Sequence, residues 1–158
     1  MKIIINKANQ VGTVVSILER QVEERLAETG VRFTGGRRQV VATLDRSGGP
    51  MSAYGVYEAL DGTVPVSSVY RTLAVLEDAG VVEPHHSAKG LTRYEMAEWL
   101  AGHHHHLVCQ VCGAVEDIEL PGGLEVDLEQ LVHTLSDLSG FSASAHSLEV
   151  VGHCPRCR

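Results

Sequence analysis

The sequence predicts an α+β protein made of two halves that differ in residue pattern and in charge. Apolar residues recur at helical spacing through residues 13–80, whereas strand-like runs surround a single helical segment after residue 103. Residues 1–90 carry 10 basic and 10 acidic side chains, but residues 91–158 carry 3 basic and 10 acidic ones. All four cysteines and all nine histidines lie at or after His85. These observations indicate two domains with different tasks.

The composition excludes several classes of protein. With 44% apolar and 21% charged residues, the 158-residue chain can bury a core and is not expected to be disordered throughout. We find no apolar run long enough to span a bilayer and no signal-peptide pattern, so we expect a cytosolic, or cytoplasmic, protein. The net charge of −7 argues against indiscriminate nucleic-acid binding but does not exclude a protein that reads DNA sequence.

The first half begins with two predicted helices. The segment 13–29 has apolar residues at three- and four-residue steps from Val14 to Leu26 and ends at Gly30. A second helix over 37–46 follows a pair of glycines and ends at a Ser-Gly-Gly-Pro break. We expect both helices to turn their apolar faces toward a common core.

Two further helices and a hairpin complete the first half. Ser52 can cap a short helix that runs to Leu60, and residues 66–80 form the next helix after a tight turn. This second helix of the pair has polar and basic residues near its start, which is typical of a helix-turn-helix. Residues 81–86 and 91–96 then predict a two-stranded hairpin with a turn at 87–90. We therefore predict a winged helix-turn-helix domain over 13–96.

The second half has a different organisation. Residues 97–102 are predicted to be a hinge, and residues 103–158 a second α+β domain. In that domain, strands over 103–112 and 113–120 are followed by a loop at 121–123, a helix closed by Gly140 and a last strand that includes His146.

Two cysteine pairs are the most specific motif in the chain. They are Cys109-x2-Cys112 and Cys154-x2-Cys157, with 41 residues between them. Two such turns supply the four thiolates that a tetrahedral zinc ion needs. Disulfides are disfavoured in a cytosolic chain, and neither pair opens a helix as a thioredoxin-like redox motif does. We therefore predict a closed, structural Zn(II) site that fastens the C-terminus to the strand of the first pair.

Four consecutive histidines precede the first cysteine pair. On a strand, successive side chains point to opposite faces, so His103 and His105 serve one site while His104 and His106 serve another. Each site then needs partners from elsewhere in the chain. The available candidates are Glu83, Glu95, Asp117, Glu129 and His146.

These motifs together resemble the ferric uptake regulator (Fur) family of metal-dependent bacterial repressors. The matching segments cover nearly the whole chain beyond residue 13. They are GVRFTGGRR (30–38), SAYGVYEAL (52–60), SSVYRTLAVLEDAGVV (67–82), HHHHLVCQVCG (103–113) and HSLEVVGHCPRC (146–157).

The resemblance implies specific metal ligands. Cys109, Cys112, Cys154 and Cys157 match the family's structural zinc ligands. A second site within the dimerisation domain matches His103, His105, Glu129 and His146. The regulatory site between the domains matches His104 and His106, with Glu83 and Glu95 as partners and Asp117 as an alternative. The regulatory metal is expected to be Zn(II) or Fe(II), with Mn(II) and Ni(II) as further candidates.

The resemblance also implies a homodimer that binds palindromic operators when metal is loaded and represses metal-homeostasis genes. Two recognition helices would then face successive turns of the major groove of double-stranded DNA. We expect Tyr70 and Arg71 to contact bases, and Ser67 and Ser68 to meet phosphates. A basic patch is expected at Arg32, Arg37 and Arg38.

Two other functions compete with this interpretation. The chain could be a peroxide-sensing relative in which iron-bound ligands are oxidised, or a metal buffer whose contact with DNA is secondary. An enzyme is disfavoured, because the sequence shows neither a nucleophile–base pair nor an open zinc site with a catalytic glutamate.

Overall fold

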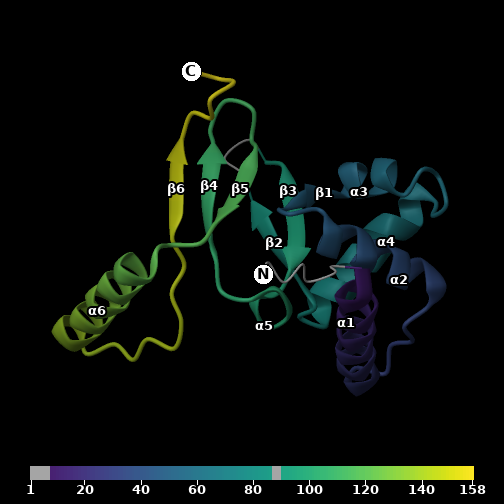
Figure 1. Cartoon of the computed structure of the whole chain (residues 1–158), viewed down its shortest axis with the longest axis horizontal. Helices are drawn as coiled ribbons and strands as arrows, with labels where there is room; N and C mark the ends of the chain where they lie inside the picture. Colours follow the sequence, from purple (N-terminus) through teal and green to yellow (C-terminus); the bar gives the residue numbers. More distant parts are fainter. Residues whose placement is uncertain (1–7, 87–89) are drawn as a thin grey trace, which may run out of the picture.

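The computed structural model describes residues 8–86 and 90–158. It is an α+β fold with a helical body, a three-stranded sheet in the order β1-β3-β2 and a second three-stranded sheet in the order β5-β4-β6 (Figure 1). The predicted fold class, helices followed by a wing and a second α+β unit, is confirmed. Within the described residues, no helix is long and apolar enough to cross a membrane.

Four helices form the N-terminal body. They are α1 (Ala8–Glu28), α2 (Gly35–Arg46), α3 (Ala53–Ala59) and α4 (Val66–Asp78). The first helix begins earlier than predicted, and the second includes the glycine pair that was expected to precede it. The side chain of Val14, which was predicted to face the core, lies outside the described part of the chain.

The predicted apolar stripes meet in one core. Val22 and Leu26 of α1, Val40 of α2, and Leu73 and Leu76 of α4 are all fully buried. Burial of an aliphatic side chain contributes about 1.5–3 kcal/mol, so this body has its own source of stability. The core also takes in Val69 of α4, while Ser67, Tyr70 and Arg71 on the other side of this helix are exposed.

The helix-turn-helix is closed by a cap and a wing. The Ser52 hydroxyl accepts a hydrogen bond from Gly55 N at 3.0 Å, which confirms the predicted cap of α3. The wing strands β2 (Val82–His86) and β3 (Thr92–Met96) pair antiparallel, and most of the turn predicted at 87–90 lies outside the described residues. A two-residue strand, β1 (Met51–Ser52), adds to the edge of β3 and was not predicted.

The predicted hinge segment is packed onto the N-terminal body. It contains a short helix, α5 (Glu98–Ala101), and Trp99 Nε1 donates a hydrogen bond to Gly80 O at 2.7 Å. Ala97 is buried, and its N–H donates to Val81 O. A change of angle between the two halves would therefore have to occur after α5.

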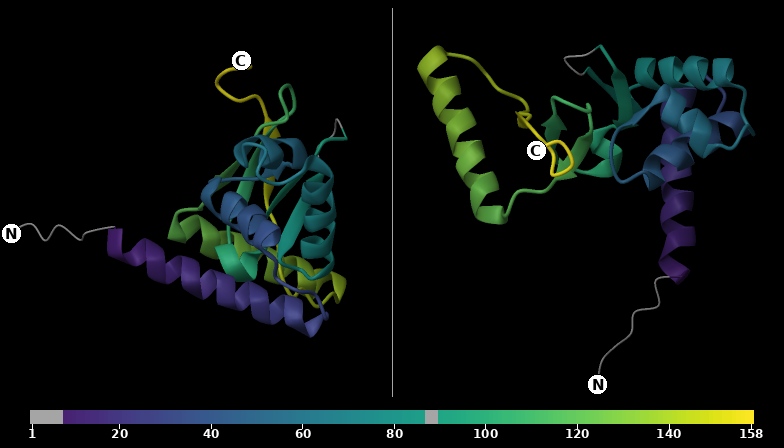
Figure 2. Two further views of the ribbon diagram at one scale, coloured as in Figure 1. Left: turned by 90° about the vertical axis from the view of Figure 1, so that its right-hand side faces the viewer. Right: turned by 90° about the horizontal axis from the view of Figure 1, so that it is seen from above.

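The C-terminal half is built on the central strand β4 (His105–Cys109). It pairs antiparallel with β5 (Val115–Ile118) and parallel with β6 (Glu149–Gly152). In the sequence, α6 (Gly122–Ser139) lies between β5 and β6. It projects away from both sheets and ends at Gly140, which has the left-handed conformation (Figures 1 and 2).

Three details of this half correct the sequence prediction. The helix begins at Gly122, inside the segment predicted to be a loop. Strand β4 begins at His105, so the first two histidines of the run precede it. Strand β6 begins at Glu149, so His146 lies in the irregular segment before it rather than on the strand.

Candidate metal centres and nucleic-acid interface

The four cysteines come together at one end of the second sheet. Cys109 ends β4, and the turn that follows carries Cys112 back toward the C-terminal turn with Cys154 and Cys157. One ligand atom from each residue lies within 4.8 Å of all the others, and the sulfur atoms of Cys112 and Cys154 are 3.8 Å apart. The donor set and its closeness fit a tetrahedral zinc ion.

The proton affinities of this cluster also fit a bound cation. Backbone N–H groups of Cys112 and Cys154 lower the pKa of Cys109 to about 5. Hydrogen bonding with the Cys154 and Cys112 sulfurs raises the pKa of Cys157 to about 12. Four thiols this close cannot all ionise in the metal-free chain, and a divalent metal removes that conflict.

A second cluster consists of His103, His105, Glu125 and His146. Glu125 Oε2 lies 2.9 Å from His105 Nε2, and Glu125 Oε1 lies 3.1 Å from His146 Nε2. His103 Nδ1 lies 2.9 Å from Glu98 Oε1, so His103 Nε2 is the atom that can supply a lone pair to a metal. His103 Nε2 lies 3.2 Å from His146 Nε2. Hydrogen bonding from His105 lowers the pKa of Glu125, so this carboxyl is held as an anion among imidazoles.

The carboxylate in this second cluster belongs to Glu125. The resemblance had implied Glu129 instead. The two residues lie one turn apart on α6, which starts at Gly122. Glu125 is half-buried against the histidines, whereas Glu129 is exposed and is not part of the cluster. The helix begins earlier than the sequence indicated, and the carboxylate nearer its start is the one that reaches the sheet.

A third cluster joins the two sheets. It consists of Glu95 from β3, His104 just before β4, His106 on β4, and Asp117 from β5. Glu95 Oε2 lies 3.3 Å from His104 Nε2, and Glu95 Oε1 lies 3.0 Å from His106 Nε2. His104 Nδ1 donates to Gly102 O at 2.9 Å, so Nε2 is the ring nitrogen that faces Glu95 and that would bind a metal once it is deprotonated.

Two features of the third cluster fit the binding of a cation. His106 Nε2 is fully buried and makes no hydrogen bond, although carboxylate oxygens of Glu95 and Asp117 lie 3.0 and 3.8 Å away. Burial and then the nearby charge of Glu95 raise the pKa of Asp117. Burial would also raise the pKa of Glu95, but the imidazoles of His85, His106 and His104 outweigh it and keep the pKa below its ordinary value.

Glu83, which was expected to be a partner in this site, is not part of it. It stands directly opposite Glu95 in the wing register, but it is exposed to solvent. His85 contacts Glu95 instead, and the hydrogen bond to that carboxylate raises the pKa of His85. Two carboxylates opposite each other repel, which favours an imidazole beside Glu95.

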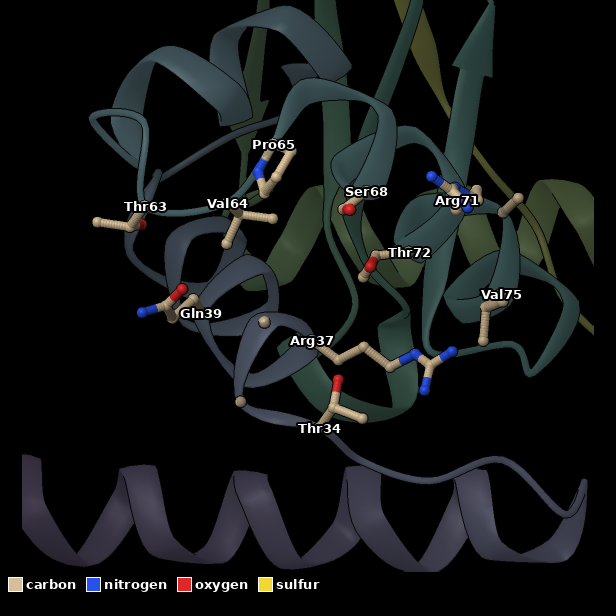
Figure 3. Close-up of a pocket in the computed structure, with 13 residues that line it drawn as sticks. Thr34, Arg37, Gln39, Thr63, Val64, Pro65, Ser68, Arg71, Thr72 and Val75 are labelled. Carbon is tan, nitrogen blue, oxygen red and sulfur yellow. The ribbon is translucent and has the colours of Figure 1, made fainter.

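Three of the predicted DNA contacts, Arg37, Ser68 and Arg71, line an open groove between α2 and α4. Arg37 and Gln39 border it on one side, and Ser68 and Arg71 border it on the other (Figure 3). Ser67 and Tyr70 are exposed on α4 next to this groove, and the guanidinium of Arg71 donates to Ser67 O at 3.2 Å. A hydroxyl, an amide and two guanidinium groups on one face are suited to phosphates and base edges.

The three arginines of the predicted basic patch have different surroundings. Arg32 is exposed, and its carbonyl accepts a hydrogen bond from Arg37 Nη1. Arg38 pairs with Glu19 and Glu23 of α1 at 3.4 and 3.0 Å. Its guanidinium also lies 4.3 Å from the centre of the Phe33 ring, so Arg38 is engaged in packing α2 against α1.

A winged helix-turn-helix is joined here to a second sheet, and three groups of metal-ligating side chains lie at that sheet or between the two sheets. This combination defines a class of protein, the metal-responsive DNA-binding regulators. The comparisons with known proteins then identify the family. The model of the ferric uptake regulator family matches residues 28–151, and the chain belongs to this family. It is therefore a metal-responsive, DNA-binding transcriptional repressor and not an enzyme.

Individual relatives cover nearly the whole chain. The chain is 32% identical over 139 residues to the ferric uptake regulation protein of Legionella pneumophila, covering 85% of this chain and 97% of that one. It is 30% identical over 141 residues to the peroxide operon regulator of Bacillus subtilis (strain 168), covering 87% and 92%. The crystal structure of the Vibrio cholerae ferric uptake regulator superimposes with a TM-score of 0.69 at 27% identity, covering 84% and 98%.

Proposed function

We propose that this chain is a homodimeric repressor that binds palindromic operators in the cytoplasm when its interdomain site has bound a divalent metal. The observation that carries the proposal is the third cluster, Glu95, His104, His106 and Asp117, because its ligands come from both sheets. A site of this kind can couple metal binding to the position of the wing and recognition helix. The cysteine cluster would hold Zn(II) as a structural ion.

The residues of the third cluster would act as a clamp between the two halves. Glu95 is fixed in the wing sheet next to the helix-turn-helix, and His106 is fixed on β4 of the second sheet. When both ligate one ion, which supplies positive charge between them, the angle between the sheets is fixed. Two copies held in this way would present their α4 helices at one spacing, which then matches the spacing of operator half-sites.

The donor chemistry restricts the regulatory metal. The cluster offers two imidazoles and two carboxylates and no thiolate. Such a set suits Fe(II), Mn(II), Zn(II) or Ni(II), and it is unsuited to soft ions such as Cu(I). The second cluster, with three imidazoles and one carboxylate, would take a further ion of the same kind.

A DNA-selection experiment tests the proposal. EDTA-treated protein that keeps its zinc would be mixed with a pool of random duplexes, and Zn(II), Fe(II), Mn(II) or Ni(II) would be added separately under anaerobic conditions. We expect one metal at sub-micromolar concentration to enrich a palindrome. If no metal enriches any sequence although the protein is a folded dimer, metal-gated operator binding is wrong and a metal-buffering role is favoured.

Peroxide sensing is a second candidate, supported by the similarity to the Bacillus subtilis peroxide operon regulator. The third cluster holds two imidazoles next to two carboxylates, which suits Fe(II) and places oxidisable side chains at the metal. Treating the Fe(II)-loaded protein with hydrogen peroxide distinguishes the two functions. Peroxide sensing requires loss of operator binding together with a mass increase of one oxygen on a peptide that contains His104 or His106, and an unchanged mass excludes it.

A further inference from the structure

We propose that His85, on wing strand β2, is an additional ligand of the interdomain metal site, so that the site takes three imidazoles and two carboxylates. The inference rests on the proposed function, because it concerns the same interdomain site. It would connect the metal to both strands of the wing rather than to β3 alone.

His85 and His106 approach the same oxygen atom. His85 Nε2 lies 2.5 Å from Glu95 Oε1, and His106 Nε2 lies 3.0 Å from that same oxygen. The two imidazole rings are in contact, with centroids 4.4 Å apart. Two ring nitrogens are thus directed at one carboxylate oxygen, and one of the two, His106 Nε2, is buried and has no hydrogen bond. A cation shared by both imidazoles and the carboxylate would satisfy these atoms.

The register of the wing places His85 beside Glu95. Glu83 pairs with Glu95 and His85 pairs with Arg93, so His85 is the diagonal neighbour of Glu95 on the same face of the hairpin. Its side chain is only 24% exposed, and it faces the cluster. His86 points to the other face, where its Nδ1 lies 3.1 Å from Thr92 Oγ1. Adjacent residues of one strand therefore provide a proposed ligand and a matched control.

The N-terminal half offers few imidazoles that could bind a metal. Residues 1–84 contain no histidine, so among the residues up to the end of β2 only His85 and His86 could provide one. His85 is the one that reaches the cluster. With His85, the site has five protein donors, three nitrogens and two oxygens, instead of four. Five donors favour an ion that accepts five or six ligands, such as Fe(II), Mn(II) or Ni(II), over a four-coordinate zinc ion.

The test is a Mn(II) titration of the full-length, zinc-containing protein, in which free Mn(II) is measured by EPR. We compare the wild type with His85→Ala, His85→Gln, His86→Ala and His104→Ala. We expect His85→Ala and His85→Gln each to weaken one class of Mn(II) site by about tenfold or more, and His86→Ala to change affinity less than twofold. Zinc content and circular dichroism confirm that each variant is folded.

The glutamine variant separates a ligand from a residue that only orients Glu95. The glutamine amide can still donate a hydrogen bond to Glu95 but does not replace an imidazole ligand. Recovery of wild-type affinity in His85→Gln would overturn the inference. The inference would also be overturned if pulsed EPR of bound Mn(II) showed the same imidazole nitrogen couplings in His85→Ala as in the wild type.

The His104 variant separates this inference from the proposed function. If His104→Ala weakens Mn(II) binding while both His85 variants bind as the wild type does, the interdomain site stands with four ligands and His85 is not among them. If His104→Ala binds Mn(II) normally as well, the interdomain site itself is wrong.

Discussion

Each histidine cluster is organised around one carboxylate that already receives imidazole hydrogen bonds. Glu125 has this role in the second cluster, and Glu95 has it in the third. A metal ion must compete with protons for these imidazoles, so metal affinity is expected to fall as the solution becomes more acidic. The hydrogen bonds keep the side chains close to the positions that a metal requires, which reduces the cost of ordering them on binding.

The glutamates of α6 allow a controlled test of the second cluster. We expect Glu125→Gln to weaken metal binding at this site by about tenfold or more, because the only carboxylate of the cluster is lost. Glu129→Gln removes the same charge one turn further along α6, where the side chain is exposed, and should leave affinity unchanged. Isothermal titration with Mn(II) measures both variants. A larger effect for Glu129→Gln would reinstate the assignment that the family resemblance implied.

Some of these ligands could be predicted from the sequence, and others could not. Strand alternation predicts that His103 and His105 belong to one site and His104 and His106 to another. The division holds although only His105 and His106 lie within β4. The choice between Glu125 and Glu129 depends on where α6 begins and how it meets the sheet, because both residues share one helical face. The position of His85 beside Glu95 depends on the register of the hairpin. The sequence does not fix that register, because it does not specify how many residues form the turn.

At the scale of elements, the pairing of α3 with α4 could be foreseen because local signals agree with tertiary packing. Ser52 caps α3 as its position predicts, and the apolar stripe of α4 is buried. The strand β1 has only two residues, and it exists because the chain entering α3 passes the edge of β3. A pairing made by neighbours distant in sequence leaves no local periodicity to detect.

Two arginines of the winged helix are expected to respond differently to substitution. Arg71 borders the groove on α4, so Arg71→Ala should weaken operator binding by about 1–3 kcal/mol while leaving the fold stable. Arg38 pairs with α1 and lies over Phe33, so Arg38→Ala should lower the free energy of unfolding by about 1 kcal/mol. Fluorescence anisotropy with a labelled operator and urea unfolding measure the two quantities.

The contrast between the two arginines has a clear failing outcome. Both proteins are compared with the wild type at one salt concentration, because phosphate contacts make affinity depend on salt. If Arg38→Ala lost as much DNA affinity as Arg71→Ala without losing stability, Arg38 would belong to the interface after all, as the basic-patch hypothesis had it.

At the scale of the whole molecule, the two halves differ in how they are stabilised. Among the described residues, the large apolar core ends at Met96. Beyond Ala97, the buried residues that the structure describes are His105, Cys109 and Gly113, and the first two belong to proposed metal sites. The C-terminal half therefore has little apolar core within one chain, and its stability is expected to come from metal ions and from a partner.

Removal of zinc should therefore unfold one half of the protein and spare the other. We expect a strong chelator, or Cys109→Ser, to abolish the cooperative unfolding of the C-terminal sheet, because the cysteine cluster fastens β6 and the C-terminus to β4. The helical body, with its own core, should keep its thermal transition. Amide hydrogen exchange read separately over residues 35–80 and 105–152 measures this, and equal loss of protection in both ranges would show that the halves are not independent.

The partner is expected to cover α6 and the adjacent sheet. No residue of this helix is buried, and both α6 and the strand β6 carry exposed apolar side chains. They are Leu124, Val126, Leu131, Leu135, Leu138 and Phe141 on and after the helix, and Val150 and Val151 on the strand. Apolar residues at three- and four-residue steps on an unpacked helix predict an interface, and a second copy of this chain would bury it with two-fold symmetry.

Two matched substitutions test this interface. Leu131→Glu combined with Leu135→Glu places charges in the apolar stripe and should convert a dimer into a monomer at micromolar concentration. His133→Glu adds a charge to the same helix away from that stripe and should leave the dimer intact. Sedimentation velocity measures both variants with zinc bound, so that loss of the metal does not confuse the result.

Because two half-sites must be bound together, the monomeric variant should also lose its preference for a palindrome over a single half-site. A double variant that stays dimeric would move the interface away from α6, and the exposed stripe would then need a different partner.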